Sequence, residues 1–170
     1  MTATEYQLSL VDWQFFGTAT WRSSTLGSCR SRENDLWGFL KEFFSLKSDL
    51  EFFQIPIVVR WERGEIGERP HAHYLVAGIL PYFVNISTCF RANNEWNKSY
   101  GHGKVRLFDS YRTHSRVLAA YTTKTRSRDE NTYEIGKFDH ADRLVVNDAA
   151  WRRMLSACTD APYTAQARTL

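Results

Sequence analysis

The sequence predicts an α+β protein in which α-helices flank a central antiparallel β-sheet. Short runs rich in β-branched and aromatic residues alternate with amphipathic helical stretches, in the order β-α-β-β-α-β-α. Two of the strands are joined by the segment RGEIGERP, whose glycines and proline indicate a hairpin turn and therefore antiparallel pairing. At 170 residues the chain is long enough to bury a substantial core, and we expect a single domain.

The first strand is predicted at residues 13–21, WQFFGTATW, because this segment is rich in aromatic residues and threonine. A helix is predicted at residues 31–47, with Asn34 or Asp35 as its N-cap. Apolar residues recur there at the spacing i, i+3, i+4 and i+7, which forms one face of an amphipathic helix. We expect this face to contain Leu36, Phe39, Leu40 and Phe43.

The middle of the chain is predicted to contain a hairpin, then a helix and a further strand. Residues 55–62, IPIVVRWE, are β-branched and short, which is typical of a buried strand, and residues 71–79, HAHYLVAGI, form the returning strand. A helix at residues 86–100 and a strand at residues 103–111 follow. This order of elements is typical of the ferredoxin-like arrangement.

Beyond residue 111 the pattern predicts a helix at residues 113–125, with Thr113 as its cap, and a short strand near residues 132–138. No phosphate-binding loop of the form G-x-x-x-x-G-K-[ST] occurs in the sequence, so an ATPase module is not indicated.

Positive charge is concentrated in one stretch of a chain whose net charge is only +3. Residues 91–128 contain nine Lys or Arg and two acidic residues. Such an excess suits a polyanion such as nucleic acid, although a solvated basic face without a ligand would have the same composition.

Three cysteines lie far apart in the sequence, at positions 29, 89 and 158, with no C-x-x-C pair. This usage argues against a disulfide framework and fits a reducing cytosol. The sequence has no basic-then-apolar leader at its start and no apolar run of about 20 residues. We therefore expect a cytoplasmic protein that is not associated with a membrane.

The stretch RPHAHYLV, residues 69–76, places two histidines one residue apart in a predicted strand. Because side chains alternate along a strand, His71 and His73 are expected on the same face. Glu62 ends the preceding strand of the hairpin and is expected beside them. Two imidazoles and a carboxylate form a set that holds one divalent ion and leaves positions open for substrate. An H-x-H pair in a strand also arises by coincidence.

A second candidate pair lies in the predicted helix at residues 113–125. Tyr121 and Lys124 are three residues apart and therefore neighbours on one helix face. A tyrosine hydroxyl activated by a nearby metal ion and a lysine is a possible nucleophile. Taken alone, Tyr121 is better explained as a core or rim aromatic on an amphipathic helix.

Taken together, these motifs resemble those of the HUH endonucleases, specifically the single-tyrosine rolling-circle replication initiators, or Rep proteins. FFGTATW resembles their first motif, RPHAHYLV the second and YTTK the third, in the family's order and over residues 13–136. Val117 and Thr125 occupy the positions four residues from Tyr121, so a second catalytic tyrosine one turn away is absent. The resemblance implies one HUH endonuclease domain over residues 1–170, with a core at about 13–140 and no helicase domain.

The resemblance also implies an activity. Glu62, His71 and His73 would hold Mg²⁺ or Mn²⁺, and Tyr121 would attack single-stranded DNA at a replication origin to give a 5′-phosphotyrosine and a free 3′-hydroxyl, with Lys124 offsetting negative charge. The enzyme would also rejoin ends. Either it would rely on a separate or host helicase, or the chain would be the nuclease fragment of a longer Rep protein. We expect phosphate contacts from Arg60, Arg69, Arg112, Arg116, Arg126 and Arg128, and base stacking on Trp21, Trp61 and Tyr74.

Three other interpretations account for part of the pattern. A non-catalytic RRM-like nucleic-acid-binding module has the same order of strands and helices, but it does not need the acid, the histidines and the tyrosine together. A transposase of the HUH superfamily has similar ligands and a similar nucleophile. A cupin-type metal oxygenase would require a regular all-β pattern around a further histidine, and the sequence lacks that pattern.

Overall fold

The computed structural model describes residue 8 and residues 10–22, 27–63, 69–109 and 143–160. Within them the chain forms an α+β fold around a five-stranded sheet of order β4-β1-β3-β2-β5, in which every neighbouring pair is antiparallel. The strands are β1 (Phe15–Trp21), β2 (Ile57–Arg63), β3 (Pro70–Val76), β4 (Gly101–Leu107) and β5 (Arg143–Val146). The helices are α2 (Cys29–Ser45), α3 (Ile86–Ser99) and α5 (Asp148–Asp160), with short 3₁₀ helices η2 (Phe52–Gln54) and η3 (Pro81–Phe83).

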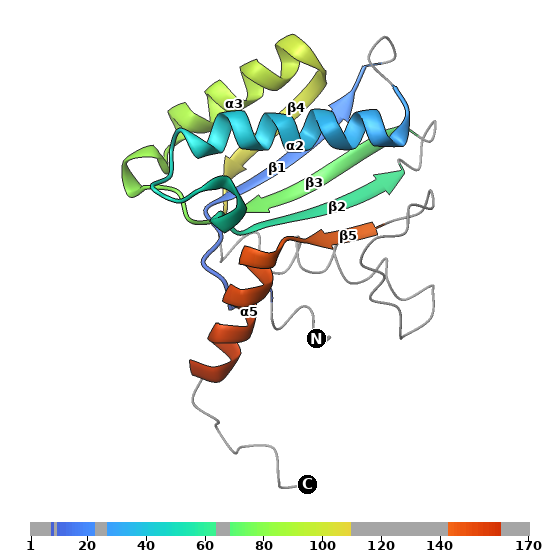
Figure 1. Cartoon of the computed structure of the whole chain (residues 1–170). Helices are drawn as coiled ribbons and strands as arrows, with labels where there is room; N and C mark the ends of the chain where they lie inside the picture. The colour runs from blue at the N-terminus through green and yellow to red at the C-terminus, as the bar shows by residue number, and fades with distance from the viewer. Residues whose placement is uncertain (1–7, 9, 23–26, 64–68, 110–142, 161–170) are drawn as a thin grey trace, which may run out of the picture.

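The elements from β1 to β4 follow the order strand-helix-strand-strand-helix-strand, so the predicted ferredoxin-like arrangement is confirmed (Figure 1). Each strand predicted before residue 111 is present as one of β1 to β4, and the two helices predicted there are α2 and α3. The helix predicted at residues 113–125 and the strand predicted at residues 132–138 lie outside the described residues.

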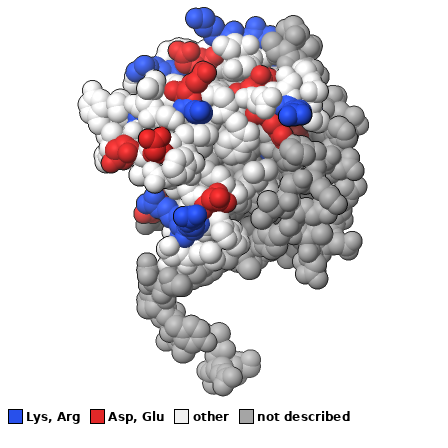
Figure 2. Space-filling view, viewed as in Figure 1, with Lys and Arg blue, Asp and Glu red and all other residues white. Residues whose placement is uncertain are grey.

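Helices α2 and α3 cover one face of the sheet (Figure 1). The predicted apolar face of α2 is confirmed, because its four residues are all buried in a core with the inner residues of β1, β2 and β3. The predicted cap is wrong: α2 begins earlier, and the Ser31 amide donates a hydrogen bond to the Ser28 hydroxyl. Asp35 instead accepts a hydrogen bond from the Trp21 indole. On the side of the molecule that carries α2, acidic and basic side chains are interspersed (Figure 2).

The opposite face of the sheet carries a second apolar cluster at one end. Phe16, Val58 and Leu75 project from β1, β2 and β3, and they are covered by the buried side chains of residues 8, 11 and 13 and of α5. Asn147 fixes the junction between β5 and α5, because its side-chain oxygen accepts hydrogen bonds from the amides of Ile57 and Ala150. The sequence pattern indicated neither β5 nor α5.

Within the described part of the chain, no helix is long and apolar enough to cross a bilayer.

Candidate metal centre

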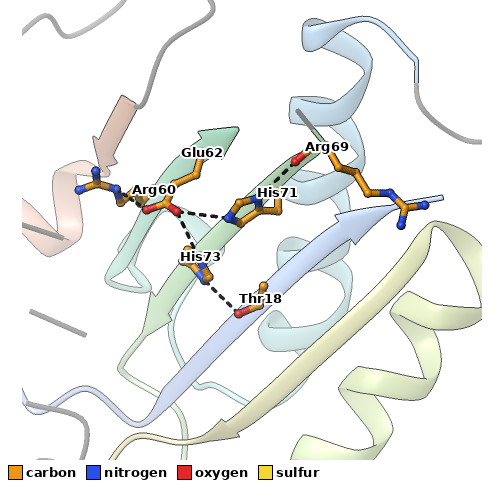
Figure 3. Close-up of polar contacts among 6 residues, drawn as sticks. All are labelled: Thr18, Arg60, Glu62, Arg69, His71 and His73. Carbon is orange, nitrogen blue, oxygen red and sulfur yellow. Dashed lines mark hydrogen bonds and ion pairs between the residues drawn. The ribbon is translucent and has the colours of Figure 1, made fainter. Parts of the chain in front are cut away.

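The strand register places the predicted ligands side by side on the sheet face that α2 and α3 leave uncovered. His71 of β3 lies directly opposite Glu62 of β2, and His73 lies opposite Arg60 of β2 on one side and Thr18 of β1 on the other. The expectation that both histidines share a face with Glu62 is therefore confirmed, and the three side chains point toward one another (Figure 3).

The two imidazoles converge on one oxygen of the carboxylate. Nε2 of His71 is 3.2 Å from Oε2 of Glu62, and Nε2 of His73 is 3.7 Å from the same oxygen. One ligand atom from each residue lies within 4.8 Å of the others. An ion about 2.1 Å from two ligand atoms, with an angle of about 90–109° between them, holds those atoms roughly 3.0–3.4 Å apart. The group could therefore hold a metal ion.

The other nitrogen of each ring also has a partner. Nδ1 of His71 donates to the Arg69 carbonyl at 3.3 Å, since a carbonyl only accepts, and Nδ1 of His73 is hydrogen-bonded to the Thr18 hydroxyl at 2.9 Å. When Nδ1 carries a proton, Nε2 faces Glu62 in one of two states. In the charged imidazolium it is a second N–H donor, and in the neutral ring it presents a lone pair. The lone pair is favourable beside a carboxylate only when a metal cation lies between them. Metal-ligating histidines in proteins commonly have this arrangement.

Glu62 is held in its charged form. Burial by itself would raise the pKa of its carboxyl, but hydrogen bonds from His71 and His73, with the positive charge of His73 and Arg60, hold that pKa well below its usual range. Nε of Arg60 lies 2.8 Å from Oε1 of Glu62, and both side chains are almost completely buried. Arg60 therefore occupies one carboxylate oxygen and leaves Oε2 facing the histidines.

The site is partly open to solvent. The side chains of His71 and His73 are 20% and 25% exposed, whereas that of Glu62 is 5% exposed. On the same face, the neighbouring edge strand β4 presents three exposed basic or imidazole side chains, His102, Lys104 and Arg106. A substrate can therefore reach the histidines from solvent, beside a positively charged strand.

Three of the residues predicted to contact DNA are misplaced for that role. Arg60 is buried and paired with Glu62, so it is not available to a phosphate. Trp21 is buried against Trp61 and Trp96, and Tyr74 is buried where its ring packs over Gly17, a position at which a Cβ atom would clash. Neither ring can stack on a base, so these predictions are wrong.

The remaining predicted residues fall into two groups. Arg69 is exposed and stays a candidate, whereas Trp61 is half-buried, stacks on Trp21 and packs against the core beneath α2 and α3, on the face opposite the histidines. Six predicted residues lie outside the described part of the chain: Arg112, Arg116, Tyr121, Lys124, Arg126 and Arg128.

Sequence reasoning missed two side chains that contact the site. Thr18 holds Nδ1 of His73, and the Phe16 ring stacks on the His73 ring with a centroid distance of 5.7 Å and an interplanar angle of 12°. Both belong to FFGTATW, whose pattern predicts a strand but singles out neither residue. Alternation along β1 indicates that they share a face, but it does not indicate that β1 lies beside β3.

Comparison of the chain with protein-family models, with curated proteins and with solved structures yields no match. The geometry of the site therefore carries the functional argument.

Proposed function

We propose that the chain is a metal-dependent, single-stranded DNA endonuclease and strand transferase of the HUH type that initiates rolling-circle replication. The observation that carries this proposal is the convergence of Glu62, His71 and His73 on one point of a ferredoxin-like sheet, on its partly open face. A purely structural histidine pair would not require a buried, ionised carboxylate and a second partner for each ring.

The charge distribution supports a polyanionic substrate. His102, Lys104 and Arg106 alternate along β4, so they project from the same face as the histidines, and in the sheet only β1 separates β4 from β3. Acidic and basic side chains are mixed on the side that carries α2 (Figure 2). A DNA backbone would therefore be attracted to the face that carries the metal centre.

The proposed chemistry is a transesterification in which the number of phosphodiester bonds is conserved. A divalent ion, Mg²⁺ or Mn²⁺, held by Glu62, His71 and His73 would polarise a non-bridging phosphate oxygen. The hydroxyl oxygen of Tyr121 attacks phosphorus, the bond to the 3′-oxygen breaks, and that oxygen takes up one proton while the tyrosine loses one. Lys124 offsets negative charge at the phosphate. Attack by a later 3′-hydroxyl reverses these steps and rejoins the strand, without ATP.

The decisive experiment detects the covalent intermediate whatever the sequence of the origin. The protein is incubated with 5′- or 3′-labelled single-stranded oligonucleotides that contain a randomised segment, with Mn²⁺ or with EDTA, and adducts are separated on denaturing gels and sequenced. We expect a Mn²⁺-dependent adduct at the 5′ end of the cleaved strand, absent in Tyr121→Phe and present in the matched control Tyr111→Phe. An adduct that persists in Tyr121→Phe would contradict the assigned nucleophile.

A non-catalytic RRM-like module is the second candidate, and the exposed basic residues of β4 are the observation that favours it. Such a module would bind single strands equally well with EDTA and with Mn²⁺, and it would form no adduct with any sequence in the pool. A transposase of the HUH superfamily would form the same adduct but would join two element ends, so sequencing of the rejoined products separates it from a replication initiator.

A further inference from the structure

We propose that Thr18 is a positioning residue that holds the His73 ring in the orientation that can bind a metal ion. The inference rests on the metal centre of the proposed function and extends it to a residue outside the ligand set. Thr18 lies directly opposite His73 in the β1–β3 pairing, and its hydroxyl oxygen is 2.9 Å from Nδ1 of His73.

The hydroxyl is a partner for Nδ1 in both neutral forms of the ring, because it can accept from Nδ1–H or donate to a bare Nδ1. When Nδ1–H donates to the Thr18 oxygen, a neutral His73 presents the lone pair of Nε2 toward Glu62, which is the form that a metal ion requires. When the proton is on Nε2 instead, the ring donates to Glu62 and the Thr18 hydroxyl keeps the ring in the same orientation. Holding the ring with Nε2 toward Glu62 therefore lowers the cost of metal binding.

The ring is also held against rotation. Phe16, two residues before Thr18 on the same face of β1, stacks nearly parallel to the His73 ring. His71 is oriented by a different group, because its Nδ1 donates to the Arg69 carbonyl rather than to Thr20, the threonine opposite it. The two histidines therefore have separate supports, and Thr20 is a matched control for Thr18: the same residue type, on the same strand and the same face.

The first test needs no variant. Long-range ¹H–¹⁵N spectra of the ¹⁵N-labelled protein, metal-free and loaded with diamagnetic Zn²⁺, report which ring nitrogen of a neutral histidine bears the proton. In the metal-free protein we expect Nε2–H of His73 to donate to Glu62, and in the Zn²⁺-loaded protein we expect the proton on Nδ1, hydrogen-bonded to Thr18. A Zn²⁺-loaded protein in which His73 keeps its proton on Nε2 and ligates through Nδ1 would overturn the role of Thr18.

The second test measures Mn²⁺ affinity by calorimetry in the absence of DNA. We expect Thr18→Val to weaken binding by about 10- to 100-fold, the usual effect of losing a group that orients a ligand. Thr18→Ser, which keeps the hydroxyl, and Thr20→Val are expected to bind as the wild type does, and circular dichroism checks that each variant folds. Equal weakening in Thr18→Ser or in Thr20→Val would overturn the role of the Thr18 hydroxyl.

The two tests separate this inference from the proposed function. A wild-type protein that binds no Mn²⁺ would overturn the metal centre itself, whereas a wild-type protein that binds Mn²⁺ with an affinity that Thr18→Val leaves unchanged would overturn the role of Thr18 alone. Failure to nick DNA with normal Mn²⁺ binding would contradict the nuclease and leave the support of His73 by Thr18 in place.

Discussion

The sheet face that α2 and α3 leave uncovered has two halves built from the same three strands, and one half is apolar whereas the other is polar. At one end, Phe16, Val58 and Leu75 are buried beneath the N-terminal segment and α5. On the same face of each strand, the next residues toward the other end of the sheet are Thr18 of β1, Arg60 of β2 and His73 of β3. After them come Glu62 of β2 and His71 of β3.

The difference teaches how a small fold combines a stabilising apolar cluster with a polar group that could hold a metal ion. The apolar half contributes burial of hydrocarbon from water, at about 25 cal/mol per Å². The polar half contains the buried ion pair between Arg60 and Glu62. The free-energy cost of removing these two charges from water offsets most of their attraction, so we infer that the pair serves metal binding rather than stability. The following predictions test this separation, starting with the largest expected effect.

Leu75→Ala should damage the apolar half alone. Leu75 is fully buried, so the free energy of unfolding should fall by about 3 kcal/mol, measured by urea denaturation. The Mn²⁺ affinity of the folded protein should not change. Leu46→Ala, at a leucine that is 80% exposed, is the control and should change the free energy of unfolding by less than about 0.5 kcal/mol. Loss of Mn²⁺ binding in folded Leu75→Ala would show that the halves are coupled.

His71→Ala should damage the polar half alone. Removal of a ligand should weaken Mn²⁺ binding by about 100-fold or more, which corresponds to about 2.7 kcal/mol, and calorimetry measures it. The free energy of unfolding should fall less than in Leu75→Ala, because the His71 side chain is partly exposed. His102→Ala removes an exposed histidine from the same sheet face and should bind Mn²⁺ normally. An equal loss in that variant would place the ion elsewhere.

The two halves should also respond differently to pH. The pKa of Glu62 is lowered in the folded protein, so its contribution to stability is fully present above the unfolded pKa of about 4.3 and declines as the pH falls below it. In EDTA, the stability of the wild type relative to Glu62→Gln should therefore fall between about pH 5 and pH 3, in urea titrations at each pH. The deficit of Leu75→Ala should stay constant over that range. A wild-type advantage over Glu62→Gln that grows on acidification would contradict the lowered pKa.

Phe16 lies at the boundary and should show the smallest effect, divided between the halves. Its ring belongs to the apolar cluster and also stacks on His73, with the Arg106 guanidinium 4.7 Å from its centroid. Phe16→Leu should lower the free energy of unfolding by about 1 kcal/mol and weaken Mn²⁺ binding by a few fold. Urea denaturation and calorimetry on one preparation measure both. A change in the free energy of unfolding alone would assign Phe16 to the apolar half, and a change in Mn²⁺ affinity alone would assign it to the polar half.

Much of the fold and of the ligand set could be predicted from the sequence, because both depend on local periodicity. Alternation places His71 and His73 on one face, and the short hairpin brings Glu62 to them. The same alternation places Tyr74 on the opposite face from His73, so its assignment to DNA stacking was avoidable. The burial of Arg60 could not be predicted in this way, because an arginine that pairs with a buried carboxylate and an arginine exposed to solvent can occupy the same position in the sequence pattern of a strand.

The sequence by itself determined the α+β class, the apolar face of α2 and the hairpin with its two histidines and one carboxylate, since neighbours within a strand, helix or tight turn are set by chain geometry. Only the tertiary structure decided that β1 lies beside β3, which brings Thr18 and Phe16 to His73 across more than 50 positions of the chain. It also decided that β5 joins the edge of the sheet beside β2, that α5 covers one half of the sheet face and that Arg60 is paired. These outcomes depend on which surfaces exclude water together, and that is settled by the packing of the whole molecule rather than by any one segment.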